Sequence, residues 1–172
     1  MSATEATDTT RDEQSSVGVF PDGGRSVWLM GMLVTFKAIS QDTGDAYSVY
    51  VATIPPHTGA PPHIHHQETE AFYLLEGELE FIAGERTVRA TSGDFLHVDK
   101  DVMHAFTNLG SAIARYVGIV TPGGLHEQLF AAIGEEATSD TVPPPPAGPP
   151  DIARLIELAS RYHTEIVPPP TR

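Results

Sequence analysis

Two stretches of the chain contain most of the side chains that could bind a metal ion. The first contains His63, His65 and Glu70. Side chains alternate along an extended chain, so His63 and His65 project from the same face and can bind one metal ion together. Glu70 begins the next apolar run, from which its carboxylate can reach the same centre. The second stretch, further along the chain, supplies His104 at the start of an expected strand.

The other histidines are less clearly connected with that site. His66 has the opposite strand parity from His65, so we expect its ring to point away from a metal. The parity of His97 relative to His104 is not set across the turn between them, and whether His97 lines the site stays open. Three further histidines are expected to lie outside the site, the last two on helix surfaces: His57, His126 and His163.

The elements that must position these residues are short runs rich in β-branched and aromatic side chains. Closely spaced runs of this kind, separated by Gly-bearing turns, indicate an antiparallel sandwich or barrel rather than βαβ units. The sequence therefore predicts an all-β domain over residues 18–121. The expected strands are Val27–Met30, Met32–Ile39, Ala46–Ile54, Ala71–Leu75, Leu79–Ala83, Thr87–Ala90, Phe95–Val98, His104–Asn108 and Ile113–Thr121.

Segments of different composition flank this domain. Residues 1–17 are polar and lack aromatic side chains, so they cannot bury enough apolar surface to become ordered and are expected to form a flexible tail. Residues 122–172 are expected to form a C-terminal helical extension. In it, an apolar stripe predicts a helix over Leu125–Ile133. A Pro-rich connector then leads to a second helix, Asp151–His163, with Asp151 as its cap.

The composition argues against several classes of protein. With 23 acidic and 10 basic residues, the net charge of −13 argues against a nucleic-acid partner and an anionic membrane surface, since both attract Lys and Arg. No apolar run approaches the ~20 residues of a membrane-spanning helix. The chain has no cysteine, which excludes disulfides, Cys-ligated zinc and thiol nucleophiles. The N-terminus lacks the basic start and apolar core of a secretory signal, so cytoplasmic residence is expected.

The two metal-binding stretches resemble the two motifs of the cupin family. The first, from Gly59 to Gly77, is aligned with the motif G-x5-H-x-H-x4-E-x6-G. The second follows G-x5-P-x-G-x2-H-x3-N, with Asp99 in place of the proline and Asp101 in place of the second glycine. Neither aspartate fixes φ or adopts a positive φ as freely, so the turn before His104 is expected to differ from the family's. The resemblance implies a cupin double-stranded β-helix, an all-β jelly-roll barrel, with one or two C-terminal α-helices.

By this resemblance, the metal ligands are His63, His65, Glu70 and His104. Three imidazoles and one carboxylate suit divalent Fe, Mn, Ni or Co, and Zn also accepts such a set, so ligand type alone does not choose the metal. A five- or six-coordinate ion keeps one or two positions open for water, substrate or O₂, as a catalytic site requires. A carboxylate can also leave the metal and accept a proton, which gives Glu70 a second role as general base.

Strand parity also predicts part of the substrate pocket. If Glu70 and His104 face inward, then Phe72, Leu74 and Phe106 do as well. An apolar and partly aromatic cavity beside a metal suits a flat organic ligand better than a sugar phosphate. The same three side chains could equally form ordinary barrel core, and the sequence leaves both interpretations open.

Among the cupins, the chain resembles single-domain relatives of the quercetinases, which are flavonol dioxygenases. The resemblance lies in the block PPHIHHQETEAFYLLEGELEF, in the last strand with its Thr-Pro-Gly-Gly ending, and in the helices and Pro-rich connector that follow. It implies a homodimer in which a flavonol binds through its hydroxyl group near the metal. Glu70 would take the hydroxyl proton, and O₂ would attack the activated ring to give a depside and carbon monoxide.

Three functions remain open from the sequence. The first is a metal-dependent dioxygenase that cleaves a flavonol-like or other enolic aromatic small molecule with O₂. The second is a cupin isomerase, cyclase or decarboxylase that uses the metal as a Lewis acid and consumes no O₂. The third is a non-catalytic cupin that binds a metal and a small ligand. Oxygen uptake distinguishes the first from the others, and anaerobic turnover distinguishes the second from the third.

Overall fold

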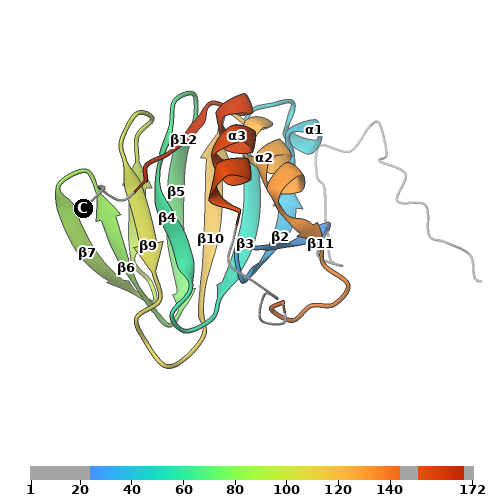
Figure 1. Ribbon diagram of the computed structural model, residues 1–172. Helices are drawn as coiled ribbons and strands as arrows, with labels where there is room; N and C mark the ends of the chain where they lie inside the picture. Colours follow the sequence, from blue (N-terminus) through green and yellow to red (C-terminus); the bar gives the residue numbers. More distant parts are fainter. Residues whose placement is uncertain (1–23, 144–150, 169–172) are drawn as a thin grey trace, which may run out of the picture.

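The computed structural model describes residues 24–143 and 151–168. The expected tail over residues 1–17 and most of the Pro-rich connector lie outside these ranges. Most of the described chain forms two antiparallel sheets, and helices lie against them (Figure 1). This arrangement confirms the predicted all-β fold with C-terminal helices.

The larger sheet has the strand order β11-β1-β2-β3-β10-β5-β8, and the smaller has the order β12-β4-β9-β6-β7. The strands of the larger sheet are β1 (Ser26–Leu29), β2 (Met32–Ala38), β3 (Ser48–Ile54), β5 (Thr69–Glu76), β8 (Phe95–Val98), β10 (Ala114–Thr121) and β11 (Glu135–Glu136). Those of the smaller sheet are β4 (Gly59–His65), β6 (Glu78–Ala83), β7 (Arg86–Thr91), β9 (His104–Thr107) and β12 (Thr164–Ile166). The helices are α1 (Ser40–Thr43), α2 (Leu125–Ile133) and α3 (Ile152–Arg161).

All the expected strands are present close to their expected bounds, but the sequence does not predict β4, β11 or β12 as strands. β4 contains Pro61 and Pro62, which have no N–H for a strand ladder, and its register with β9 shifts between Ala60 and His63. β11 and β12 are short and pair with β1 and β4, which are remote in the chain. Such pairings depend on the tertiary structure rather than on local pattern.

Apolar side chains fill the interior between the sheets. Phe72, Phe81, Phe106 and Tyr116 are all buried, and their rings meet edge-on or tilted with centroids 5.0–6.1 Å apart. Burying an aromatic or aliphatic side chain of this size stabilises a fold by about 1.5–3 kcal/mol. The cluster therefore provides a tightly packed frame for the polar residues on the neighbouring strands.

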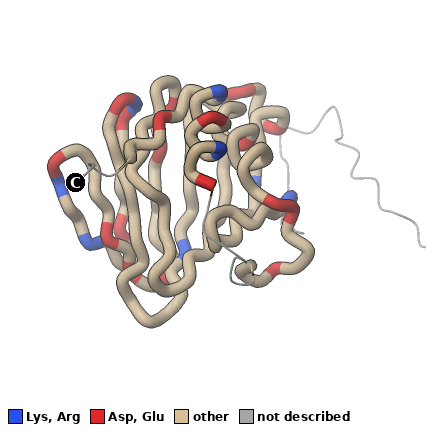
Figure 2. Tube along the Cα trace, viewed as in Figure 1, with Lys and Arg blue, Asp and Glu red and all other residues tan. Residues whose placement is uncertain are grey.

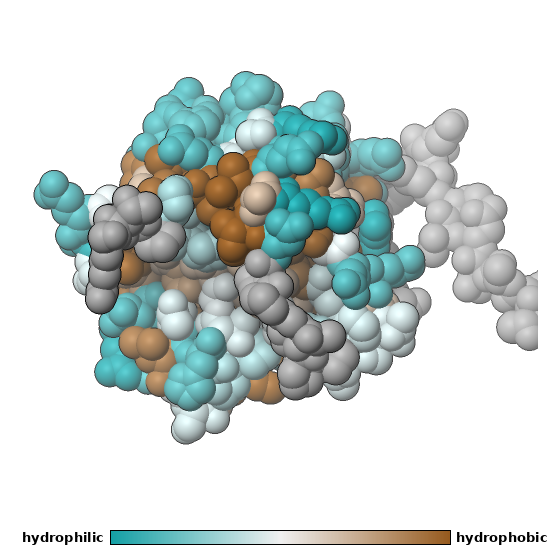
Figure 3. Space-filling view, in the orientation of Figure 1, coloured by the Kyte–Doolittle hydropathy of each residue, from teal (hydrophilic) through white to brown (hydrophobic). Residues whose placement is uncertain are grey.

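The two longer helices, α2 and α3, lie side by side against the sheets (Figure 1). Both agree with the prediction: α2 ends before Gly134, and the Asp151 side chain accepts a hydrogen bond from the Arg154 backbone N–H at the start of α3. Leu155 is buried beneath α3, whereas Ile156 on the same helix is exposed. The surface around α3 accordingly includes an apolar area (Figure 3).

Charged residues lie mainly at turns, at strand ends and on the helices (Figure 2). They are largely absent from the strand centres that face the interior. Within the described part of the chain, no helix has the length and apolar character needed to cross a membrane.

Candidate metal centre

The four residues predicted as metal ligands come together in the interior. His63 and His65 lie on β4, Glu70 lies on β5, and His104 lies on β9 directly opposite His63 in the strand pairing. One ligand atom from each of the four lies within 4.8 Å of the others. His65, Glu70 and His104 are buried, and His63 is half-buried. The structure thus brings together, from three strands, the full predicted set.

Each of the three histidines is held through its Nδ1 atom by a neutral group. The partners are the Pro61 carbonyl for His63 (2.8 Å), the Thr164 hydroxyl for His65 (3.0 Å) and the Val102 carbonyl for His104 (3.0 Å). A ring that donates its Nδ1–H to a neighbouring oxygen presents an unprotonated Nε2, the form that binds metals. The Nε2 atom of His65 is buried and has no hydrogen-bond partner. These contacts fit a metal ion bound among the Nε2 atoms.

The two oxygens of Glu70 face different groups. Oε2 lies 3.1 Å from His104 Nε2 and 3.6 Å from His65 Nε2, on the side of the candidate ligands. Oε1 accepts a hydrogen bond of 2.5 Å from the hydroxyl of Tyr50, which lies on β3. Burial and the adjacent Glu70 charge raise the pKa of Tyr50 well above its usual value, so the hydroxyl keeps its proton and donates it to Oε1.

The pKa shifts of the four residues favour a cation at the site. Burial lowers the pKa of His63 to about 3, with a further contribution from its histidine neighbours, and burial also lowers the pKa of His65. Burial acts in the same direction on His104, but the hydrogen bond to Glu70 prevails and raises its pKa. Burial would raise the pKa of Glu70, yet the surrounding imidazoles hold it well below its usual range. A metal cation would replace the proton that Glu70 and His104 share.

His126 is buried, which corrects the expectation that it lies on a helix surface. Its ring lies between two buried carboxylates, with Nδ1 3.8 Å from Glu68 and Nε2 3.5 Å from Glu70. It also stacks on Tyr50, with ring centroids 5.5 Å apart. Burial opposes protonation of His126, but the charges of Glu70 and Glu68 prevail and raise its pKa. The expected apolar stripe consists of Leu125, Leu129, Ala132 and Ile133, whereas the buried residues of α2 are His126 and Leu129.

A second group of potential ligands lies beside the first and consists of His65, Glu68 and His126. His65 would have to offer its Nδ1 atom there, because its Nε2 atom faces Glu70. Thr164 already bonds that Nδ1 atom, so only Glu68 and His126 have donors free. Two donors are fewer than a protein metal site normally provides. Glu68 instead caps α2, since its Oε1 atom accepts the backbone N–H of His126 at 2.8 Å.

The remaining histidines lie at the surface, away from the four ligands. His66 points outward as its parity predicts and contacts Asp101 at 2.7 Å. His97, which the sequence left open, is exposed and lies 3.1 Å from Asp99. His57 and His163 are also exposed.

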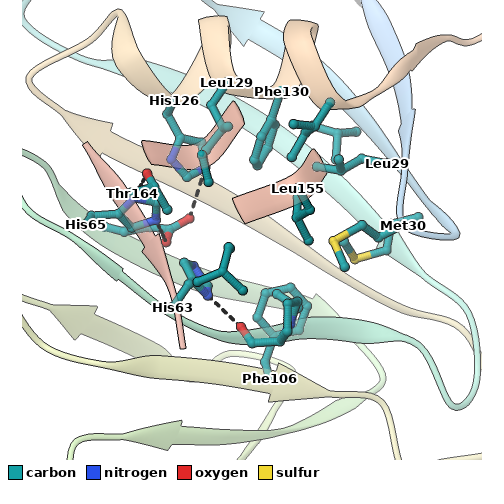
Figure 4. A pocket seen from close by; sticks show the side chains of 18 of the residues that line it. Leu29, Met30, His63, His65, Phe106, His126, Leu129, Phe130, Leu155 and Thr164 are labelled. Carbon is teal, nitrogen blue, oxygen red and sulfur yellow. Dashed lines mark hydrogen bonds and ion pairs between the residues drawn. The ribbon is translucent and has the colours of Figure 1, made fainter. Parts of the chain in front are cut away.

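A small apolar cavity of about 60 Å³ adjoins the candidate ligands. His63, His65 and Glu70 are among its lining residues, and the C-terminal segment contributes Leu155 and Thr164 (Figure 4). In the figure, His65 and Thr164 lie together at one side of the cavity, and the aliphatic groups lie across it. The cavity can therefore hold an organic group directly beside a bound metal.

Of the three predicted pocket residues, the structure places one at the cavity. Phe106 lines it, whereas Phe72 and Leu74 are fully buried in the core and are not among the residues that line it. Their inward parity is as expected. Parity sets the face of a strand but not the depth along the barrel, and Phe72 packs against Phe81 and Tyr116 instead.

Comparison with known proteins agrees with this fold. Residues 50–120 match the family model for the cupin domain. Over 98 residues the chain is 31% identical to quercetin 2,3-dioxygenase from Bacillus subtilis (strain 168), a match that covers 57% of this chain and 28% of the Bacillus protein. A cupin described as RmlC-like, from Shewanella frigidimarina NCIMB 400, superposes with a TM-score of 0.54 at 13% identity, covering 63% of this chain and 92% of that one. KdgF from Halomonas sp. superposes with a TM-score of 0.50 at 16% identity, covering 55% and 81%.

These structural likenesses show the fold, and the family match identifies the domain. The chain has the cupin fold, and its residues 50–120 match the cupin domain. In sequence it resembles the quercetinases, although it spans only about a quarter of the length of the Bacillus relative, 28%.

Two positions depart from the glycines of the cupin motifs, and both take a glycine-like conformation. The first motif usually has a glycine six residues before its first histidine; His57 stands there, whereas Gly59 comes only four residues before His63. His57 has φ = 60°, and Asp101, which replaces the glycine of the second motif, has φ = 65°. The turn before His104 thus keeps the left-handed residue that the aspartate was expected to disfavour, and Asp is among the side chains that tolerate it best.

Proposed function

We propose that the protein is a metal-dependent dioxygenase that acts on an enolic aromatic small molecule of the flavonol type. The observation that carries this proposal is the shared orientation of three histidines. Their Nδ1 atoms are all engaged by neutral oxygens, so their Nε2 atoms are the ones available to a metal beside the Glu70 carboxylate, at an apolar cavity. The partial similarity to quercetin 2,3-dioxygenase supports the choice of reaction.

His63, His65, Glu70 and His104 would hold one divalent ion, Fe, Mn, Ni or Co, with Zn also compatible with the donors. When bound, such an ion supplies a Lewis-acidic centre and, if it is redox-active, electron exchange with O₂. The choice of these four residues rests on their convergence and on the lack of any sulfur ligand.

The protein's own residues would bind the substrate and move its proton. Glu70 is ionised at neutral pH because its pKa is low, and Oε2 is the atom that faces the site. That oxygen would accept the proton of the substrate hydroxyl. Met32, Leu129 and Leu155 line the cavity and would hold the carbon skeleton away from water. Exclusion of water strengthens the electrostatic interactions of the resulting anion with the site.

The size of the cavity bears on which substrate is bound. Its 60 Å³ has room for only a few water molecules, whereas ligand pockets usually measure about 300–1,000 Å³. A three-ring flavonol would therefore enter only if α3 and β12, which form part of the wall, move outward. The same small volume favours a second candidate function, a cupin isomerase, cyclase or decarboxylase that uses a compact enolic substrate without O₂.

Oxygen uptake by metal-loaded protein tests the proposal. We expect a panel of flavonols to cause oxygen uptake by protein loaded with at least one of Fe, Mn, Ni and Co. We expect Glu70→Gln to abolish this uptake. His97→Ala, which removes an exposed histidine, is the matched control and should retain the wild-type rate. Turnover of a compact enol under anaerobic conditions would favour the second function. Metal binding without turnover of either kind would leave a non-catalytic binding protein.

We also propose that the protein is a homodimer that pairs through the outer face of the larger sheet. Tyr73 on β5 pairs with Phe95 on β8, and their side chains are 44% and 61% exposed. Leu75 and Ile119 extend this apolar surface along β5 and β10. Light scattering should give the mass of two chains, and Phe95→Lys should give that of one.

A further inference from the structure

We infer that Tyr50 holds the Glu70 carboxylate so that only one of its oxygens is offered to the metal centre, which leaves a coordination position open for a ligand from the cavity. The inference rests on the proposed metal centre. Tyr50 is a positioning residue in this account, since it acts through Glu70 and contacts none of the three candidate histidine ligands by hydrogen bond.

The two oxygens of Glu70 face different groups. The Tyr50 hydroxyl donates to Oε1 at 2.5 Å, on the side of β3. Oε2 is the oxygen that lies next to the Nε2 atoms of His104 and His65, at 3.1 and 3.6 Å. A carboxylate can bind a cation through one or through both of its oxygens. Because Oε1 is turned towards the Tyr50 phenol and Oε2 towards the imidazoles, binding through both would require the carboxylate to rotate against that hydrogen bond.

Close packing determines where the Tyr50 hydroxyl lies. The side chain is 1% exposed and stacks on His126, with an angle of 16° between the rings. Across the strand pair, Tyr50 lies opposite Gly118 on β10. A Cβ atom at Gly118 would lie 2.2 Å from the Tyr50 Cζ atom, so only glycine leaves the ring its place. A glycine in the middle of a buried strand weakens the strand, but here it permits the close approach of the Tyr50 ring.

The open position matters because the protein's own donors leave few coordination positions for a bound ligand. Three imidazoles and one carboxylate oxygen occupy four positions of an ion that takes five or six. A second carboxylate oxygen would occupy a fifth position on the side of Glu70, and a small ligand from the cavity would have to displace it. Tyr50 thus keeps the centre accessible rather than strengthening it.

Co(II)-loaded protein provides a test that does not depend on turnover, because the ligand-field absorption of Co(II) reports its coordination geometry. We would compare the wild type with Tyr50→Phe, before and after titration with azide as a small exogenous ligand. We expect the variant to show the weaker, shifted absorption of a higher coordination number and to lose most of the azide-dependent change. Tyr47→Phe removes an exposed phenol that lies outside the cavity lining, and it should retain the wild-type spectrum.

A crystal structure of Co(II)-loaded wild-type protein complements the variant, which could fail to fold. It should show one Glu70 oxygen on the metal and the other still bonded to Tyr50. Coordination through both oxygens, or identical azide responses of the wild type and a folded Tyr50→Phe variant, would overturn the inference alone. Failure of the wild type to bind Co(II) would instead overturn the proposed metal centre.

Discussion

The Nδ1 atoms of the three candidate ligand histidines and the rings of two exposed histidines contact different kinds of partner. His63, His65 and His104 in the interior are held at Nδ1 by two carbonyls and a hydroxyl. On the surface, His66 and His97 contact the carboxylates of Asp101 and Asp99. A carbonyl or hydroxyl acceptor orients the ring through Nδ1, whereas the Asp101 carboxylate raises the pKa of His66. The first arrangement prepares a metal ligand, and the second forms a surface ion pair.

The largest expected effect comes from removing an interior ring. His104→Ala should lose most of the bound metal, because it removes one of the four ligands. The protein should stay folded, because the scaffold packs independently of the three ligands that remain. Elemental analysis of protein purified without chelator measures the loss, and circular dichroism checks the fold. His97→Ala should keep its metal. Full metal content in His104→Ala would mean that this interior histidine, like the surface histidines, does not bind the metal.

The pH dependence of metal-free stability should also distinguish interior from surface. The pKa of His63 falls from 6.5 to about 3 on folding, so between these values the unfolded chain binds the extra proton. Stability should therefore decrease as the pH falls from 6.5 towards 3, by up to about 1.4 kcal/mol per pH unit from this group. Urea unfolding in chelator at pH 7 and pH 4.5 measures the slope.

His63→Asn should reduce that slope, whereas His97→Ala should leave it unchanged. An unchanged slope in His63→Asn would mean that other buried groups account for the acid sensitivity.

A smaller effect is expected when a ring keeps its place but loses its partner. Thr164→Val removes the hydroxyl that holds His65 Nδ1 and should weaken metal binding by about ten-fold, the lower end for partners of metal-binding histidines. Thr164→Ser keeps the hydroxyl and is the matched control. Competition with a chromophoric chelator gives both affinities. Equal affinities for the Val and Ser variants would show that the Nδ1 contact does not matter.

The smallest effect is expected at the surface. The hydrogen bond to Asp101 raises the pKa of His66, so the contact stabilises the fold at low pH and its contribution is lost as the pH rises through the raised value. His66→Ala should therefore lower the melting temperature slightly at pH 6 and not at pH 9, with no change in metal content. A large loss of metal in this variant would contradict its placement outside the site.

Much of the site follows from sequence spacing because the ligands lie on short extended segments. A two-residue spacing puts His63 and His65 on one face whatever the rest of the fold, and Glu70 and His104 each begin an apolar run. The strands are likewise predicted by local alternation, since one face of each is buried. β4, the strand that carries His63 and His65, is the exception. Its two prolines are unfavourable in a strand, so the local pattern does not predict it.

The contacts that orient His65 and Glu70 could not be predicted, because they come from segments remote in the chain, whereas His63 and His104 bond backbone carbonyls two residues away. Thr164 reaches His65 through the pairing of β12 with β4, and Tyr50 reaches Glu70 from β3. His126 gives no local sign that α2 turns it inward between two carboxylates.

The sequence by itself thus determined which side chains can bind a metal, since alternation and residue chemistry are local properties. Only the tertiary structure decided how His65 is held and which oxygen of Glu70 faces the site. Orientation depends on hydrogen bonds and packing between strands and helices that meet only in the folded chain.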